Sequence, residues 1–205
     1  MPGTGNGGKH ENAQPHTYMN KTALQLAGWG ATISAALTAP LIALQMATIR
    51  SGPVSPSTAI QLVNLLFFAY ALDALRRLLA YKRFKYANRY LTSIIGVTLI
   101  VQLIAPFVNE MRVLALPILA GLVLQGILYI VAGTKLLRFA PRLPGLKLFS
   151  LAAITVGVCS ASIVLALIVL PVSMVMNIAL AIIFFTEAGS SGTHAATVLN
   201  GDRRK

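Results

Sequence analysis

The chain has 205 residues, of which 56% are hydrophobic and only 11% are charged, and its formal net charge at pH 7 is +12. Soluble domains contain about 25% charged residues, so this composition excludes an ordinary soluble protein and indicates an integral membrane protein. A strongly positive chain is also typical of nucleic-acid binding, but the placement of the cations explains the charge better as a membrane-orientation signal.

Polar tails flank an apolar centre. We expect three regions: a disordered cytoplasmic N-terminal tail over 1–21, a transmembrane domain over 22–187, and a disordered basic C-terminal tail over 188–205. Translation could begin at Met1 or at Met19, which lies just before the first apolar stretch.

The apolar stretches have the length of membrane-spanning helices. A helix needs about 20 apolar residues to cross about 30 Å of hydrocarbon, because each residue adds about 1.5 Å. In chain order, the predicted transmembrane helices cover residues 22–49, 59–75, 91–108, 113–133, 148–169 and 172–187.

The last apolar run, 148–186, contains no charged residue. As one helix it would extend roughly 58 Å, about twice the hydrocarbon thickness. Pro171 lacks a backbone donor and disfavours helix in the residue before it, so we place a tight turn at Pro171–Ser173 between two helices. One tilted helix kinked at Pro171 is the alternative.

The cations favour the six-helix reading. Fifteen of the seventeen Lys and Arg residues lie in the two tails and in the connections after the second and fourth helices, and only Arg50 and Arg112 lie elsewhere. Cytoplasmic loops are enriched in Lys and Arg. We therefore predict an all-α bundle of six transmembrane helices in three hairpins, with both termini cytoplasmic, in a bacterial-type inner membrane. Five helices would carry the basic C-terminal tail across the membrane.

Catalytic signatures are missing from the sequence. It has no HExxH, GxSxG, Walker-type or CxxC pattern, its three histidines all lie in the predicted tails, and Cys159 is its one cysteine. We therefore expect no enzymatic activity, no cofactor and no metal site. A lipid-modifying enzyme is the least favoured function.

Two acids lie near helix ends. Asp73 precedes Arg76 and Arg77 by three and four residues, so a helix places it beside both cations, and Glu187 ends the last predicted helix. Acids in membrane segments are expensive and often functional. Both could contact an ion or substrate, even in one shared site; alternatively, both are interfacial residues.

Amides form a second candidate set. Asn64, Gln125 and Asn177 occupy comparable positions in the second, fourth and sixth predicted helices, and could form a polar layer that contacts an ion or solute. The alternative is hydrogen bonding between helices, which we also assign to the other polar residues of the segments: Gln25, Gln45, Gln61, Gln102, Ser160 and Ser162.

Small residues recur at four-residue spacing in two predicted helices. Ala27, Ala31, Ala35 and Ala39 line the first helix, and Ala153, Gly157 and Ala161 the fifth. Such faces allow close helix packing, which we expect within the chain rather than between copies.

The segment 76–90 alternates cations with aromatic residues. Aromatics anchor at the headgroup level and cations attract anionic lipid. The segment fits an ordinary positive-inside loop with an aromatic belt. The alternative is docking of anionic lipid headgroups, or of an acidic partner, by six cations: Arg76, Arg77, Lys82, Arg83, Lys85 and Arg89.

Two hypotheses for the function remain, and the first is favoured over the second. The missing catalytic groups and the basic face favour a non-enzymatic subunit or helper of a membrane complex, with another membrane protein as its possible partner. The alternative is a transporter or channel for ions or small solutes that uses the intramembrane acids. The helper predicts Asp73 sealed against its neighbouring arginines, and the transporter predicts Asp73 facing a hydrated cavity.

Overall fold

The computed structural model describes residues 20–51, 56–82, 84–104, 115–162 and 166–202. These residues form six α-helices and one 3₁₀ turn: α1 Lys21–Ser51, α2 Pro56–Tyr81, α3 Lys85–Ile104, α4 Ala115–Leu137, η3 Ala140–Arg142, α5 Leu146–Ala161 and α6 Ala166–Asp202. The predicted all-helical class is thereby confirmed for the described residues. The predicted N-terminal tail up to residue 19 and both candidate start methionines lie outside them.

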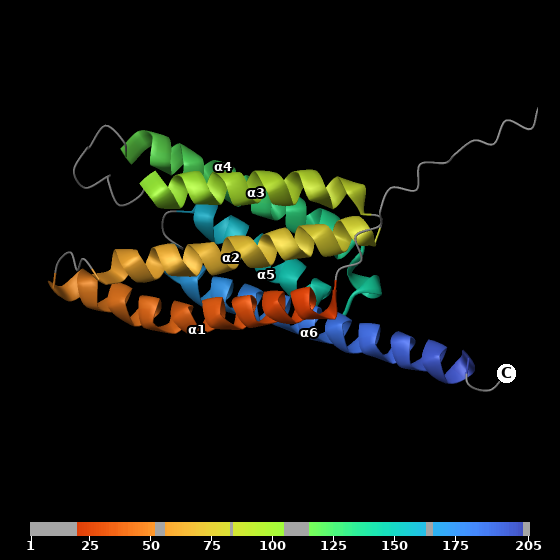
Figure 1. Cartoon of the computed structure of the whole chain (residues 1–205). Helices are drawn as coiled ribbons and strands as arrows, with labels where there is room; N and C mark the ends of the chain where they lie inside the picture. Colours follow the sequence, from red (N-terminus) through yellow and green to blue (C-terminus); the bar gives the residue numbers. More distant parts are fainter. Residues whose placement is uncertain (1–19, 52–55, 83, 105–114, 163–165, 203–205) are drawn as a thin grey trace, which may run out of the picture.

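The six helices close into a ring. Each helix packs against the next one in the chain, and α6 returns to pack against α1. Successive helices run in alternating directions, so α1 begins and α6 ends at the same end of the bundle (Figure 1). The ring therefore has an interior that every helix can reach.

Four helices are long and apolar enough to cross a membrane, over Lys21–Leu44, Thr58–Tyr81, Leu116–Leu137 and Ile168–Ser190. The described parts of α3 and α5 are shorter: α5 has 16 residues, about 24 Å at 1.5 Å per residue. The molecule is thus a multi-pass membrane protein by helix length and composition.

Small residues bring α4 and α5 into close contact. A Cβ atom built on Gly157 would lie 2.5 Å from the carbonyl oxygen of Gly126, and one built on Gly126 would lie 2.6 Å from that of Gly157. A Cβ on Gly133 would lie 2.8 Å from the carbonyl oxygen of Ser150. Side chains larger than hydrogen do not fit there, and the close approach gains dispersion contacts. The small face predicted around Gly157 packs inside the molecule.

The small face of α1 is also internal. Ala27, Ala31 and Ala35 are buried, whereas Ala39, the fourth member of the predicted face, is exposed. A Cβ on Gly28 would lie 3.0 Å from the ring of Phe185 in α6. Close packing of α1 on α6 completes the ring.

The break between the last two helices differs from the prediction. Two separate helices are present, but α5 ends at Ala161 and α6 begins at Ala166, so a turn at Pro171–Ser173 is wrong and so is one helix kinked at Pro171. Pro171 lies inside α6, near its start. A proline there removes one intrahelical hydrogen bond, and membrane helices tolerate this loss where neighbouring groups satisfy the freed carbonyl.

The helices are also longer than predicted at their polar ends. α2 continues past 75 to Tyr81, α3 begins at Lys85 rather than at 91, and α6 continues past 187 to Asp202. The predicted boundary of the C-terminal tail at 188 thus falls within α6. Hydropathy marks only the apolar part of a helix, whereas the Lys, Arg and Ala residues that continue α2 and begin α3 are themselves strong helix formers.

The α4–α5 contact yields a stability test. We expect Gly157→Ala to lower the free energy of unfolding by about 1–3 kcal/mol, because the new methyl group meets backbone that must shift. The matched control is Gly96→Ala in α3, where a Cβ has no neighbour within 4 Å; it should leave stability unchanged or raise it by up to about 1 kcal/mol. Unfolding in mixed micelles measures both, and equal effects would contradict the close contact.

Candidate functional site: a polar cavity inside the helix ring

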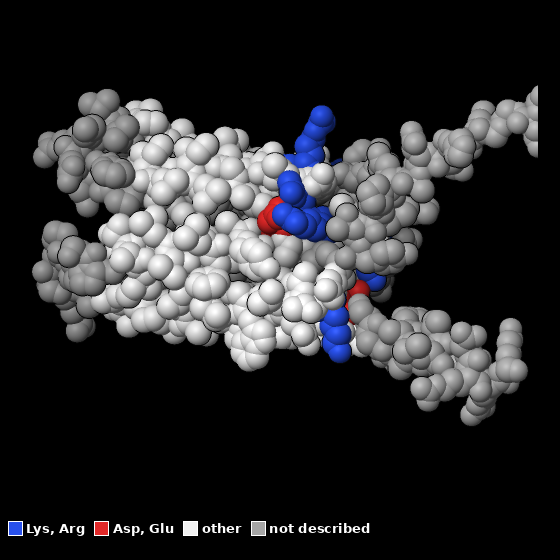
Figure 2. Space-filling view, in the orientation of Figure 1, with Lys and Arg blue, Asp and Glu red and all other residues white. Residues whose placement is uncertain are grey.

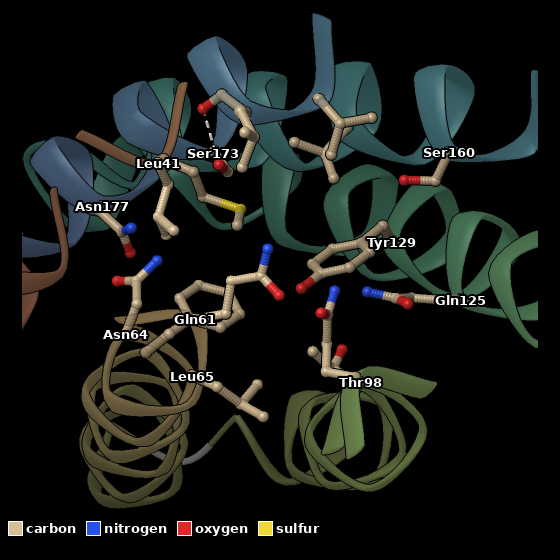
Figure 3. A pocket seen from close by; sticks show the side chains of 16 residues that line it. Leu41, Gln61, Asn64, Leu65, Thr98, Gln125, Tyr129, Ser160, Ser173 and Asn177 are labelled. Carbon is tan, nitrogen blue, oxygen red and sulfur yellow. Dashed lines mark hydrogen bonds between the residues drawn. The ribbon is translucent and has the colours of Figure 1, made fainter. Parts of the chain in front are cut away.

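A cavity of about 170 Å³ lies inside the ring and is lined by residues from all six helices. Its apolar lining includes Leu41, Phe68 and Met176. Its polar lining consists of nine side chains: Gln61, Asn64, Thr98, Gln102, Gln125, Tyr129, Ser160, Ser173 and Asn177. The polar groups converge on one space from opposite sides (Figure 3).

The cavity lies away from the charges. Gln61 is near the start of α2 and Gln102 near the end of α3, at the end of the bundle opposite to the described Lys, Arg, Asp and Glu side chains (Figure 2). Among the described residues, no charged side chain lines the cavity. Its interior is polar but uncharged.

A hydrogen-bond network forms one wall. The Ser34 hydroxyl donates to Asn64 Oδ1 at 2.6 Å and accepts from Asn177 Nδ2 at 3.0 Å. Asn64 Nδ2 donates to Thr38 Oγ1 at 3.5 Å. Ser34 and Thr38 have no exposed surface, so they fix the positions of both amides. The network joins α1, α2 and α6 and holds Asn64 and Asn177 side by side (Figure 3).

The opposite wall is formed by α3 and α4. Thr98, Gln125 and Tyr129 are buried and point toward one another across the lower right of the cavity in Figure 3. Thus the two walls present an asparagine pair on one side and a hydroxyl–amide–phenol group on the other.

Three oxygen atoms of this site have no hydrogen bond of good geometry within the described residues, although Thr98 and Gln125 both lie beside the Tyr129 hydroxyl. Among the described side chains, the buried oxygens without a hydrogen bond are Thr98 Oγ1, Gln125 Oε1 and Asn177 Oδ1, and all three residues line the cavity. An unsatisfied buried polar group costs about 1–3 kcal/mol. Molecules in the cavity would remove that cost: water, or a polar solute. Because amide oxygens can only accept, the site favours a guest that donates hydrogen bonds.

The predicted acids lie elsewhere. Asp73 Oδ1 is 2.7 Å from Arg76 Nη2, and Asp73 Oδ2 is 2.8 Å from Arg77 Nε, which confirms the predicted placement beside both cations. Glu187 is 3.0 Å from Lys82 Nζ. The two acids thus have different cation partners, and neither lines the cavity.

The predicted amides do come together. Asn64, Gln125 and Asn177 all line the one cavity. Gln61, Gln102 and Ser160 were expected only as interhelical polar residues, and three further lining residues were not predicted from the sequence: Thr98, Tyr129 and Ser173. Their signal was a hydroxyl group in the middle of an apolar segment, which is too common to single out.

The six cations predicted to dock a lipid or partner have different environments in the structure. Arg76, which also donates to Thr92 Oγ1 at 3.2 Å, joins Arg77 and Lys82 in ion pairs with the two acids. Arg89 is exposed. Arg83 and the side chain of Lys85 lie outside the part of the chain that the structure describes.

No protein family, no curated protein and no solved structure matches this chain.

Ser34 provides a test of the network. We expect Ser34→Ala to lower the free energy of unfolding by about 1–3 kcal/mol, because it removes a donor from Asn64 and an acceptor from Asn177 inside the bundle. The control is Thr155→Ala, which removes an exposed hydroxyl bonded only to the carbonyl of Leu151. Thermal unfolding in detergent compares them; equal losses would show that the network adds nothing specific.

Proposed function

We propose that this protein is a membrane carrier or channel that binds small uncharged polar solutes in the central cavity. One observation carries the proposal: the three unpartnered buried oxygens found among the described side chains all belong to residues that line this one cavity. A polar space lined by every helix of a ring is a natural binding place for a solute crossing the membrane.

The proposed topology has six transmembrane helices in three hairpins, with both termini on the cytoplasmic side of a bacterial-type inner membrane. The alternating helix directions in Figure 1 and the charged end in Figure 2 support it. Fifteen of seventeen cations fall on the same side in this topology, as the positive-inside bias requires.

The solute class follows from the lining. Among the described residues the cavity offers amides and hydroxyls and no charge, so a charged guest would lose its hydration without gaining a counter-charge. The unpartnered amide oxygens require donors. Small neutral molecules that carry N–H or O–H groups, such as short amides, urea or polyols, meet both conditions. The cavity volume of about 170 Å³ is large enough for a few such small molecules.

Transport through this cavity needs no proton coupling by a carboxylate. Asp73 is held by Arg76 and Arg77, outside the cavity. The expectation that intramembrane acids carry transport is therefore replaced, in this proposal, by binding to Asn64, Gln125 and Asn177.

Flux in liposomes tests this function. We expect the reconstituted protein to speed the entry of urea, acetamide or glycerol, measured by light scattering after an osmotic step. Gln125→Leu and Asn177→Leu should each lower the protein-dependent rate about tenfold or more, the cost of losing roughly 1.4 kcal/mol or more of solute binding. A protonophore should leave the rate unchanged.

Gln25→Leu is the matched control, since Gln25 is an exposed α1 residue that does not line the cavity. It should retain the full rate. The proposal fails if all three variants behave like the unaltered protein, or if none of the solutes enters faster than into empty liposomes.

A second function is a non-enzymatic subunit or helper of a membrane complex. The ion pairs of Asp73 with both arginines favour it, as does an apolar groove of about 400 Å³ between α1 and α2 that includes the exposed Trp29 and Leu66. Native mass spectrometry of the protein extracted in mild detergent separates the two functions. A stoichiometric second membrane protein supports the helper, and a monomer or homo-oligomer supports the carrier.

A further inference from the structure

A second cavity, of about 270 Å³, lies between the start of α3 and the end of α4, at the charged end of the bundle. Its floor includes Leu91 and Leu136, which are almost fully buried. Lys135 and Arg138 line it from exposed positions. The cavity therefore combines an apolar interior with two cations that water and ligands can reach.

These two cations are not neutralised within the described part of the molecule. The two acidic side chains that the structure describes are paired with cations on and just after α2. Among the described residues, no carboxylate lies within ion-pair distance of Lys135 or Arg138. The carbonyl groups at the end of α4 favour a nearby cation, but they do not explain an apolar cavity beside it.

The positions of the two cations and of the aromatic residues beside them suit a lipid headgroup. Lys135 lies in the last turn of α4 and Arg138 just after its end, and both line the same cavity. Two such cations can hold one phosphate, the arginine with two parallel hydrogen bonds. Tyr90 and Phe139 also line the cavity, and aromatic residues settle at the level of lipid headgroups.

We propose that this cavity binds an anionic glycerophospholipid. Its phosphate lies between Lys135 and Arg138, and its glycerol and upper acyl chain lie against Leu91 and Leu136. A soluble phosphate compound would use the cations but leave the apolar floor unoccupied, so the combination favours a lipid. Within the 76–90 segment, Arg76, Arg77 and Lys82 already have acidic partners, and Tyr90 lines this cavity.

Lipid titration of the purified full chain tests the site. The probes are phosphatidylglycerol and phosphatidylcholine, added in mild detergent and counted by native mass spectrometry. We expect tighter binding of phosphatidylglycerol. Its affinity should fall about fivefold for each cation removed in Lys135→Gln and Arg138→Gln, and about 25-fold in the double variant. A double variant that keeps the charges, Lys135→Arg with Arg138→Lys, should retain most of the affinity.

The matched control removes two exposed cations from the same end of the bundle, Lys21 and Lys147, by changing both to Gln. It should bind phosphatidylglycerol within about twofold of the unaltered protein, because only diffuse attraction is lost. Equal losses in the two neutralised double variants would overturn the site in favour of general charge attraction. No preference for phosphatidylglycerol would also overturn it, as would displacement of the lipid by millimolar inorganic phosphate.

Discussion

The need to satisfy polar groups away from water organises this molecule. In a membrane, a buried amide or hydroxyl must find a partner inside the protein, because lipid offers none. Ser34 meets that need for Asn64 and Asn177 and so joins three helices. The hydroxyl oxygen of Thr98 and the amide oxygen of Gln125 have no hydrogen bond of good geometry among the described residues, and both residues line the same interior space. In the polar cavity, the missing hydrogen bonds would come from water or a bound solute.

Local pairing of charges keeps that interior neutral. Asp73 is held by two arginines of its own helix, and Glu187 by Lys82 from the end of α2. All of these groups lie toward one end of the bundle (Figure 2). A carboxylate in the cavity would invite cations or protons, whereas amides and hydroxyls select neutral donors. The separation of charge from the cavity is therefore what gives the proposed carrier its solute class.

Close helix contacts and open space complement each other in the ring. Gly126 and Gly157 let α4 and α5 approach until no Cβ fits between them, and buried alanines of α1 accompany its packing on α6. Longer polar side chains from α2, α3 and α4 line the cavity. Small residues thus fix the wall, and amides such as Gln125 line the space within it.

The sequence by itself determined the class of protein, its helical content and the placement of Asp73 beside Arg76 and Arg77, because hydropathy, charge clusters and helical spacing are local properties. It placed the last turn wrongly, since Pro171 is tolerated near the start of a helix, and ended α6 too early. The cavity was decided only by the tertiary structure. Thr98, Gln125 and Asn177 are far apart in the chain, and closure of α6 onto α1 brings their helices around one space.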